Sequence, residues 1–269
     1  MIYRHNIDPA ILRIGNIEIR WYGIIYILGF VLSYLFFSYC KKNKLLRISN
    51  DDLLDLFFYS FFGLTIGARI FYVLFYNLAY YFENPLKIFF VWEGGFSFHG
   101  GLLGVILGGL IFCKQYKKNF FKLADLMTIP VSLALGIGRI GNFINGELWG
   151  RPTGANWGVI FPNAFGEDPR HPSQIYEFFK NELIFLVLIL VFLKYKKRKD
   201  GFLLALFLVL YGVLRFLVEF FREPEVYVGA LTMGQFLSLP LIIAGTLMLI
   251  FIFRKKIYAH KKNNSVPRH

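Results

Sequence analysis

An arginine stands inside a glycine-rich stretch of this chain, GIGRIGNFINGELWG, residues 136–150. The glycines at 136, 138 and 141 match the G-x-G-x-x-G pattern of dinucleotide-binding loops, which requires a strand before it and a helix opening at it. The preceding run, LADLMTIPVSLAL, has no period-two alternation and contains Pro130. The sequence therefore does not indicate a nucleotide site, and Arg139 needs another explanation.

A second arginine, Arg215, lies in the apolar stretch FLLALFLVLYGVLRFLVEFFREP, residues 202–224. Four polar residues of this stretch are separated by intervals of 4, 4 and 3 residues, which put them on one helix face. They are Tyr211, Arg215, Glu219 and Arg222. Glu219 is expected to pair with Arg215 one turn away, which lowers the cost of burying both charges.

These residues together favour an anionic ligand. The three arginines, with Glu219 and Glu147, carry a formal net charge of +1. Because the planar fork of a guanidinium suits phosphate oxygens, the set predicts a site for a monoanionic phosphate group, such as a phosphodiester.

The elements that position these residues are predicted to be membrane helices. Of the 269 residues, 56% are hydrophobic and 32 are Phe, which is far too apolar for one soluble core. The net charge is +13, and 19 of the 30 Lys and Arg residues lie in four segments, 41–47, 114–122, 194–199 and 254–269. Because these segments fall at every second loop, they indicate positive-inside membrane topology rather than nucleic-acid binding.

We therefore predict an all-α, polytopic membrane protein with seven transmembrane helices of about 20 residues, the amino terminus outside and the carboxyl terminus cytoplasmic. The predicted spans are 21–40, 53–76, 96–113, 123–145, 173–193, 202–221 and 235–253. Residues 1–269 are expected to form a single integral membrane domain with an outer loop region at about 146–172. The first twenty residues lack the pattern of a removable signal peptide.

Polar side chains within the bilayer are costly and mark functional sites. In this topology Arg139 lies about 24 Å along its helix, in the outer third of a roughly 30 Å hydrocarbon core. The same outer depth is predicted for four more polar residues: Tyr22, Arg69, His99 and Asn142.

Structural explanations stay open for several of these residues. Tyr22 is also consistent with an aromatic belt, Arg222 with snorkelling to the interface, and Arg69 with pairing to nearby backbone carbonyls. Three glycines spaced by four, Gly100, Gly104 and Gly108, favour a close helix-packing face.

Two function classes remain after the motifs are considered. A transporter would place polar groups near the midplane and show internal repeats, and neither is visible. H-E-x-x-H and G-x-S-x-G are absent, and the five histidines lack metal-ligand spacing, so no metal is predicted; His5, in the amino-terminal tail, is expected to be solvated. An enzyme acting on a lipid headgroup is favoured, and the alternative is a transporter or binder of anionic phospholipid headgroups.

Four segments resemble the signature segments of the bacterial prolipoprotein diacylglyceryl transferase family. They are HGG from His99, GRIGNFINGELWGRPT from Gly138, RHPSQIYE from Arg170 and YGVLRFLVEFFREP from Tyr211. The resemblance implies transfer of the diacylglyceryl group of phosphatidylglycerol to the lipobox cysteine thiol of a secreted lipoprotein precursor. The reaction forms a thioether and releases glycerol phosphate, in the bacterial cytoplasmic (inner or plasma) membrane, with the active site towards the outer leaflet.

With this activity, we expect His99, Arg139 and Arg215 to be catalytic, the first as general base and the arginines as phosphate clamps. The expected substrate-binding residues are Tyr22, Arg69, Asn142, Glu147, Gly150, Glu219 and Arg222. The expected partners are phosphatidylglycerol, lipoprotein precursors and the bilayer, with no nucleic acid and no cofactor, because the phospholipid already carries the ester that reacts. Cys40 and Cys113 fall at inner span ends, so the nucleophilic sulfur is expected to come from the protein substrate.

Overall fold

The computed structural model describes residues 2–15, 17–224 and 226–264. The chain divides into two compact units, one made of Met1–Ser33 with Ala124–His269 and the other of Tyr34–Leu123. Helices α1 and α5 each contribute residues to both units.

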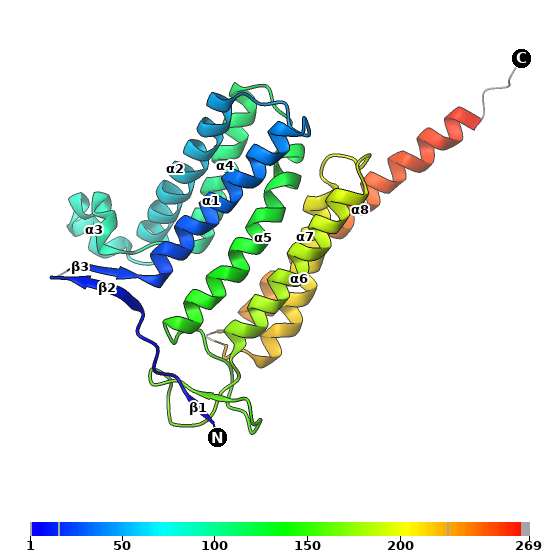
Figure 1. Cartoon of the computed structure of the whole chain (residues 1–269). Coiled ribbons are helices and arrows are strands. Elements are labelled where there is room, and N and C mark those ends of the chain that lie inside the picture. Colours follow the sequence, from blue (N-terminus) through cyan, green and yellow to red (C-terminus); the bar gives the residue numbers. More distant parts are fainter. Residues whose placement is uncertain (1, 16, 225, 265–269) are drawn as a thin grey trace, which may run out of the picture. The chain divides into compact units, whose positions relative to one another are not determined.

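The first unit holds most of the long helices, α5 to α8 (Figure 1). Within it, α6 packs on α7, and α7 packs along α8. Its helices are α1 (Trp21–Lys42, in part), α5 (Phe120–Ile144, in part), α6 (Ser173–Lys194), α7 (Phe202–Val218), the 3-10 turn η3 (Glu219–Phe221) and α8 (Met233–Asn264). Its strands are β1 (Tyr3–Arg4), β2 (Ala10–Ile14), β3 (Ile17–Arg20), β4 (Val159–Ile160), β5 (Tyr227–Val228) and β6 (Leu231–Thr232).

The short strands form three two-stranded pairs that the sequence analysis did not predict. β1 pairs in parallel with β4, β2 is antiparallel to β3, and β5 is antiparallel to β6. The expectation that His5 is solvated is wrong, because its side chain is only 5% exposed. His5 Nε2 lies 2.7 Å from the Phe143 carbonyl oxygen, and its ring packs against Phe143 and Phe161.

The amino-terminal end of α7 is completed by a carboxylate from α5. The N-cap position is Gly201, which has no side chain to satisfy the free backbone N–H groups of the first turn. Asp125 instead accepts hydrogen bonds from Gly201 N at 3.0 Å and Leu204 N at 2.8 Å. This contact fixes the start of α7 against α5 and so helps to place the polar residues that α7 carries further along.

The second unit consists of α2 (Asn50–Phe75), α3 (Leu78–Glu83), the 3-10 turns η1 (Pro85–Phe89) and η2 (Val91–Glu93), and α4 (Phe98–Gln115), with the end of α1 and the start of α5. A capping box begins α2, because the Ser49 side chain accepts from Asp52 N and the Asp52 side chain accepts from Ser49 N. α2 and α4 pack against each other along most of their length.

Glycine residues form the contact between α2 and α4. A Cβ atom on Gly104 would clash with the Gly63 carbonyl, and one on Gly100 would clash with the Gly67 carbonyl. At Gly108 a Cβ would lie about as close to the Tyr59 carbonyl, so the helix backbones touch along the whole run. The predicted packing face of Gly100, Gly104 and Gly108 is confirmed.

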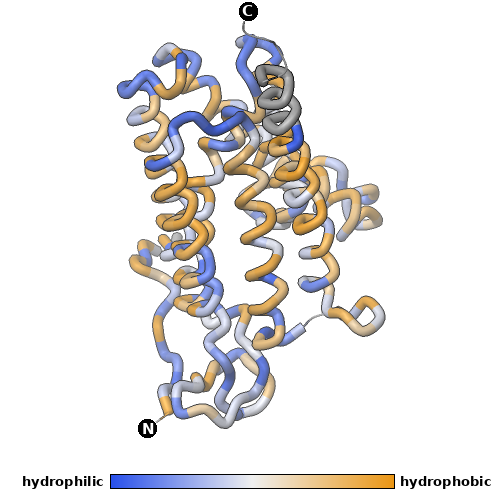
Figure 2. The backbone as a smooth tube through the Cα atoms, turned by 90° about the vertical axis from the view of Figure 1, so that its right-hand side faces the viewer, coloured by the Kyte–Doolittle hydropathy of each residue, from blue (hydrophilic) through white to orange (hydrophobic). Residues whose placement is uncertain are grey.

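Six helices of the described residues are long and apolar enough to cross a membrane, which makes this a polytopic helical membrane protein. They are Trp21–Lys42, Asn50–Phe75, Phe98–Gln115, Phe120–Ile144, Phe202–Phe221 and Met233–Arg254. Figure 2 shows apolar colouring along most of these helices and polar colouring in many of the segments between them. Helix α6, predicted as a seventh span, is not among the six, and it carries Glu177, Lys180 and Glu182 in its first half.

Candidate active site

Helix α6 places a buried carboxylate among the arginines that the sequence analysis selected. Its polar residues Gln174, Glu177, Lys180 and Asn181 follow at helical spacing, so they share one face, and all four are buried. Glu177 is 0% exposed and lies deepest in this set with Gln174. A buried charge needs counter-charges, and α6 itself and two neighbouring helices supply them.

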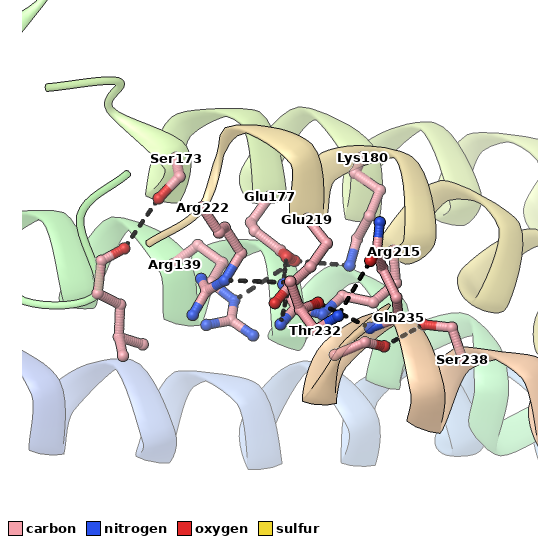
Figure 3. Close-up of polar contacts among 12 residues, drawn as sticks. Arg139, Ser173, Glu177, Lys180, Arg215, Glu219, Arg222, Thr232, Gln235 and Ser238 are labelled. Atoms are coloured by element: carbon pink, nitrogen blue, oxygen red, sulfur yellow. Dashed lines mark hydrogen bonds and ion pairs between the residues drawn. The ribbon is translucent and has the colours of Figure 1, made fainter. Parts of the chain in front are cut away.

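Three cations from three helices surround Glu177 (Figure 3). Its Oε2 atom lies 2.6 Å from Lys180 Nζ and 3.8 Å from Arg139 Nε, on α6 and α5. Its Oε1 atom accepts a hydrogen bond from Arg215 Nη1, on α7. The two predicted arginines, 76 positions apart in the sequence, are thus joined through one carboxylate.

Glu219 forms a second bridge within the same cluster. Arg215 Nη2 lies 2.8 Å from Glu219 Oε2, which confirms the predicted pairing one helical turn apart. The same oxygen lies 3.5 Å from Arg222 Nε. Within the part of the chain that the structure describes, Arg222 Nη1 is buried without a hydrogen-bond partner, so it is available to an acceptor from a ligand.

A chain of hydrogen bonds connects Arg139 to the loop that follows α5. Arg139 Nη1 donates to Asn142 Oδ1 at 3.3 Å, and Asn142 Nδ2 donates to Glu147 Oε1 at 2.7 Å. Asn145 Nδ2 lies 3.4 Å from the same Glu147 oxygen. Arg139, Asn142 and Glu147 therefore form one connected group beside the Glu177 cluster.

The backbone after Glu147 is held by the first turn of α6. Gln174 Nε2 donates to the Glu147 carbonyl at 2.7 Å, and Ser173 Oγ donates to the Leu148 carbonyl at 2.9 Å. Leu148 has a φ of 58°, a left-handed conformation that is uncommon outside glycine, so these bonds hold a strained position.

Gly150 lies where the loop passes between two other backbone segments. A Cβ at this position would clash with the Phe221 carbonyl and lie 2.7 Å from the His171 Cβ atom. Gly150 N donates to the His171 carbonyl at 2.9 Å, and Gly150 forms a backbone bridge with Arg222. Gly150 thus lets the loop pack against the backbone of Arg222, whose side chain belongs to the cluster.

The nearby His171 ring lies 3.1 Å from the Tyr176 hydroxyl, and burial lowers the pKa of this histidine.

Tyr22 is the other predicted residue of the first unit. It lies at the start of α1, where the Tyr26 hydroxyl donates to the Tyr22 hydroxyl at 3.2 Å. A Cβ on Gly141 would lie 2.9 Å from the Tyr22 ring, so this glycine of the GIGRIGNFING stretch gives α1 room to approach α5. The structure thus places Tyr22 against the turn of α5 that lies between Arg139 and Asn142.

Two predicted residues, Arg69 and His99, belong to the second unit. Arg69 Nε donates to the Ile88 carbonyl at 2.9 Å, and its Nη atoms reach the carbonyls of Lys87, Phe90, Gly94 and Gly95. Pairing with backbone carbonyls is the structural role that the sequence left open for Arg69, and it makes this residue the anchor of the segment between α3 and α4. His99 lies in the first turn of α4 and is exposed.

Glu177 and Lys180 were not predicted from the sequence as members of the cluster. A signal was present, because the RHPSQIYE segment that carries part of the family resemblance ends at Glu177. Counting both leaves the predicted net charge unchanged: Arg139, Arg215, Arg222 and Lys180 face Glu147, Glu177 and Glu219, four cations against three carboxylates, for +1. The cluster can therefore hold a monoanion by arginine hydrogen bonds in a largely buried setting. Among the side chains that the structure describes, no group of three His, Cys, Asp or Glu residues is arranged to hold a metal ion.

Comparison with known proteins identifies the family of this chain. The family model for prolipoprotein diacylglyceryl transferase matches residues 9–251. Phosphatidylglycerol--prolipoprotein diacylglyceryl transferase of Geobacter sulfurreducens is 46% identical over 94% of this chain and 98% of its own length. The proteins of the same name from Aliivibrio salmonicida and Bordetella parapertussis are 44% and 46% identical, over 97% and 94% of this chain and 93% and 98% of their own lengths. The chain belongs to the prolipoprotein diacylglyceryl transferase family.

Proposed function

We propose that this chain transfers the diacylglyceryl group of phosphatidylglycerol to the cysteine thiol of a lipoprotein precursor. The relatives carry this activity in their names and match over nearly the whole chain. The observation that carries the proposal is the largely buried cluster in which three arginines and Lys180 face three carboxylates, for a net charge of +1, since a phosphatidylglycerol headgroup is a phosphodiester monoanion.

In the proposed reaction, the thiolate sulfur of the precursor attacks the glycerol carbon that carries the phosphate ester. A carbon–sulfur bond forms, the carbon–oxygen bond to the phosphate breaks, and its electron pair stays on the phosphate oxygen. The products are the thioether and glycerol phosphate, and the thiol proton leaves with the base or the phosphate. Arg139 and Arg215 stabilise the charge that accumulates on the departing phosphate.

The other predicted residues have supporting roles in this proposal. His99 is the general base, because a free thiol with a pKa near 8.5 is mostly protonated at neutral pH. Asn142 and Glu147 position the headgroup glycerol by hydrogen bonds, and Glu219 orients Arg215. The remaining proposed contacts to the substrates are Tyr22, Gly150 and Arg222. Arg69, whose guanidinium donates to backbone carbonyls, is proposed to act by anchoring the segment between α3 and α4.

We further propose that α6 is a seventh span, so that the amino terminus is outside and the carboxyl terminus cytoplasmic. The basic segments at 41–47, 114–122 and 194–199 support this orientation. With this orientation, the chain forms one integral membrane domain in the bacterial cytoplasmic (inner or plasma) membrane. Loop 146–172 and the active site then lie at the outer side.

A reporter that is active only in the cytoplasm tests this topology. It should work when fused after Lys44, Lys118 or Lys197 and fail when fused after Asn84. The opposite pattern would overturn the outer placement of the site.

A transfer assay with purified protein tests the activity. Phosphatidylglycerol labelled in its acyl chains is incubated with a lipobox peptide, and the peptide is examined for the added mass of one diacylglyceryl group. Transfer by the natural chain, lost in Arg139→Ala, is the expected result. A well-folded sample that binds the lipid but modifies no peptide would favour the alternative, a transporter or binder of anionic headgroups.

A further inference from the structure

Glu177 has an arrangement that the proposed reaction does not use directly. Its carboxylate is fully buried, and it contacts one cation on each of three helices: Arg139 on α5, Lys180 on α6 and Arg215 on α7. Lys180 is itself enclosed, with 2% of its side chain exposed and its Nζ atom 4.1 Å from the centre of the Tyr211 ring. Figure 3 shows the Glu177 carboxylate among the side chains of Arg139, Lys180 and Arg215.

These contacts argue against a role for Glu177 as a proton acceptor. Both carboxylate oxygens are engaged by cations, and no part of the side chain is accessible to a thiol. The effect of Glu177 must therefore act through the arginines that it touches. Because it joins α5 to α7, it fixes the separation of the two guanidinium groups that clamp the phosphate.

Glu177 also sets the charge of the cluster. With it, four cations face three carboxylates; without it, the same cations would face two, and the net charge would rise from +1 to +2. The substrate is a phosphodiester monoanion, whereas the product glycerol phosphate is a monoester that carries about −1.5 to −2 near neutral pH. A cluster with a charge of +2 would hold the product more strongly than the substrate.

We propose that Glu177 is a positioning residue that holds Arg139 and Arg215 side by side and limits the charge of the cluster, so that the phosphate monoester product is released. This proposal rests on the proposed function, which supplies a phosphate monoester as the product. It assigns two separable effects to one carboxylate, one on geometry and one on charge.

Three variants separate these effects. Glu177→Gln removes the negative charge and weakens the link between the arginines. The double variant Glu177→Gln/Lys180→Met also weakens the link but restores a net charge of +1. Glu182→Gln is the matched control, because it makes the same chemical change five residues further along α6, at a carboxylate for which no ion pair to these arginines is found among the described residues.

The charge effect is measured by the affinity of glycerol phosphate for the purified proteins in lipid nanodiscs, in the absence of any turnover. For Glu177→Gln we expect affinity higher on the order of tenfold to a hundredfold, because one nearby carboxylate has been removed. The double variant and Glu182→Gln should bind within a few-fold of the natural chain. Unchanged affinity in a folded Glu177→Gln protein, or an equal gain in Glu182→Gln, would overturn the charge effect.

The geometric effect is measured by steady-state transfer. Glu177→Gln and the double variant should both lose turnover, with kcat falling and the KM for phosphatidylglycerol not rising, whereas Glu182→Gln should keep most of its turnover. A double variant with natural kcat would overturn the geometric effect. If the natural chain transfers nothing, the proposed function fails, and the binding measurements still report the charge effect.

A variant that changes the charge in the other direction covers the case in which Glu177→Gln does not fold. Lys180→Met lowers the net charge of the cluster to zero while Glu177 keeps its contacts to both arginines. Its affinity for glycerol phosphate should fall on the order of tenfold. An affinity equal to that of the natural chain would again contradict the charge effect.

Discussion

Replacing Arg215 by lysine tests whether the cluster acts through arginine geometry or only through positive charge. Arg215 donates through Nη1 to Glu177 and lies 2.8 Å from Glu219 through Nη2, with 17% of its side chain exposed. A lysine keeps the charge but has a single nitrogen, so it cannot hold both carboxylates and also present a planar pair of donors to a phosphate.

The expected loss follows from the number of donors removed. Loss of one preorganised donor to a developing oxyanion lowers kcat by about a hundred- to a thousandfold, or roughly 3–4 kcal/mol of transition-state stabilisation. We expect Arg215→Lys to fall in this range while it remains inserted and elutes as a single species in detergent. Arg198→Lys, outside the cluster, is the matched control.

The assay uses phosphatidylglycerol labelled in its headgroup glycerol and measures the release of water-soluble glycerol phosphate in the presence of a lipobox peptide. Initial rates over a range of lipid concentrations separate kcat from KM. Turnover within a few-fold of the natural chain in a folded Arg215→Lys protein would refute the argument from fork geometry. A loss of equal size in Arg198→Lys would indicate a general effect on the protein.

Three further predictions concern other parts of the chain. His99→Gln should lose most transfer at neutral pH and recover part of it at raised pH, where the substrate thiol ionises unaided; an equal loss at every pH would assign His99 to binding. Asp125→Asn can accept only one of the two hydrogen bonds at the start of α7, so it should lower stability by roughly 1–2 kcal/mol and the Tm by a few degrees, with the specific activity of the folded protein retained; an unchanged Tm would contradict the capping role. The double variant Cys40→Ala/Cys113→Ala should retain most transfer, and a diacylglyceryl adduct on either cysteine, detected by mass spectrometry, would contradict direct attack by the substrate thiol.

Local spacing predicted those parts of the cluster that lie on one helix. Arg215 and Glu219 are four residues apart, so their pairing depends only on the helix that carries them. The glycine face of α4 was predictable for the same reason, because glycines spaced by four residues lie on the same side of a helix. The identity of the helix that it touches, α2, required the tertiary structure.

Residue spacing within one helix could not predict contacts between segments that are distant in the sequence. Glu177 lies 38 residues from both Arg139 and Arg215, and nothing in the periodicity of α6 indicates which helices face its polar side. Arg69 was left between ligand binding and carbonyl pairing, because its acceptors lie 18 to 26 residues away in an irregular segment. The burial of His5 likewise depends on the Phe143 carbonyl, 138 residues away.

The pairing of β1 with β4 has a consequence for the order in which the protein can be assembled. Tyr3 pairs with Val159, so the first strand leaves the ribosome well before its partner has been made. At about 5–20 residues per second, the delay is roughly 8–30 s. During that time the segment that contains His5 has no partner strand, and it can be captured only after most of α5 and the following loop have been synthesised. Completion of this region therefore has to wait until residue 160 has been synthesised, and a bulky fusion at the amino terminus is expected to interfere with it more than one at the carboxyl terminus.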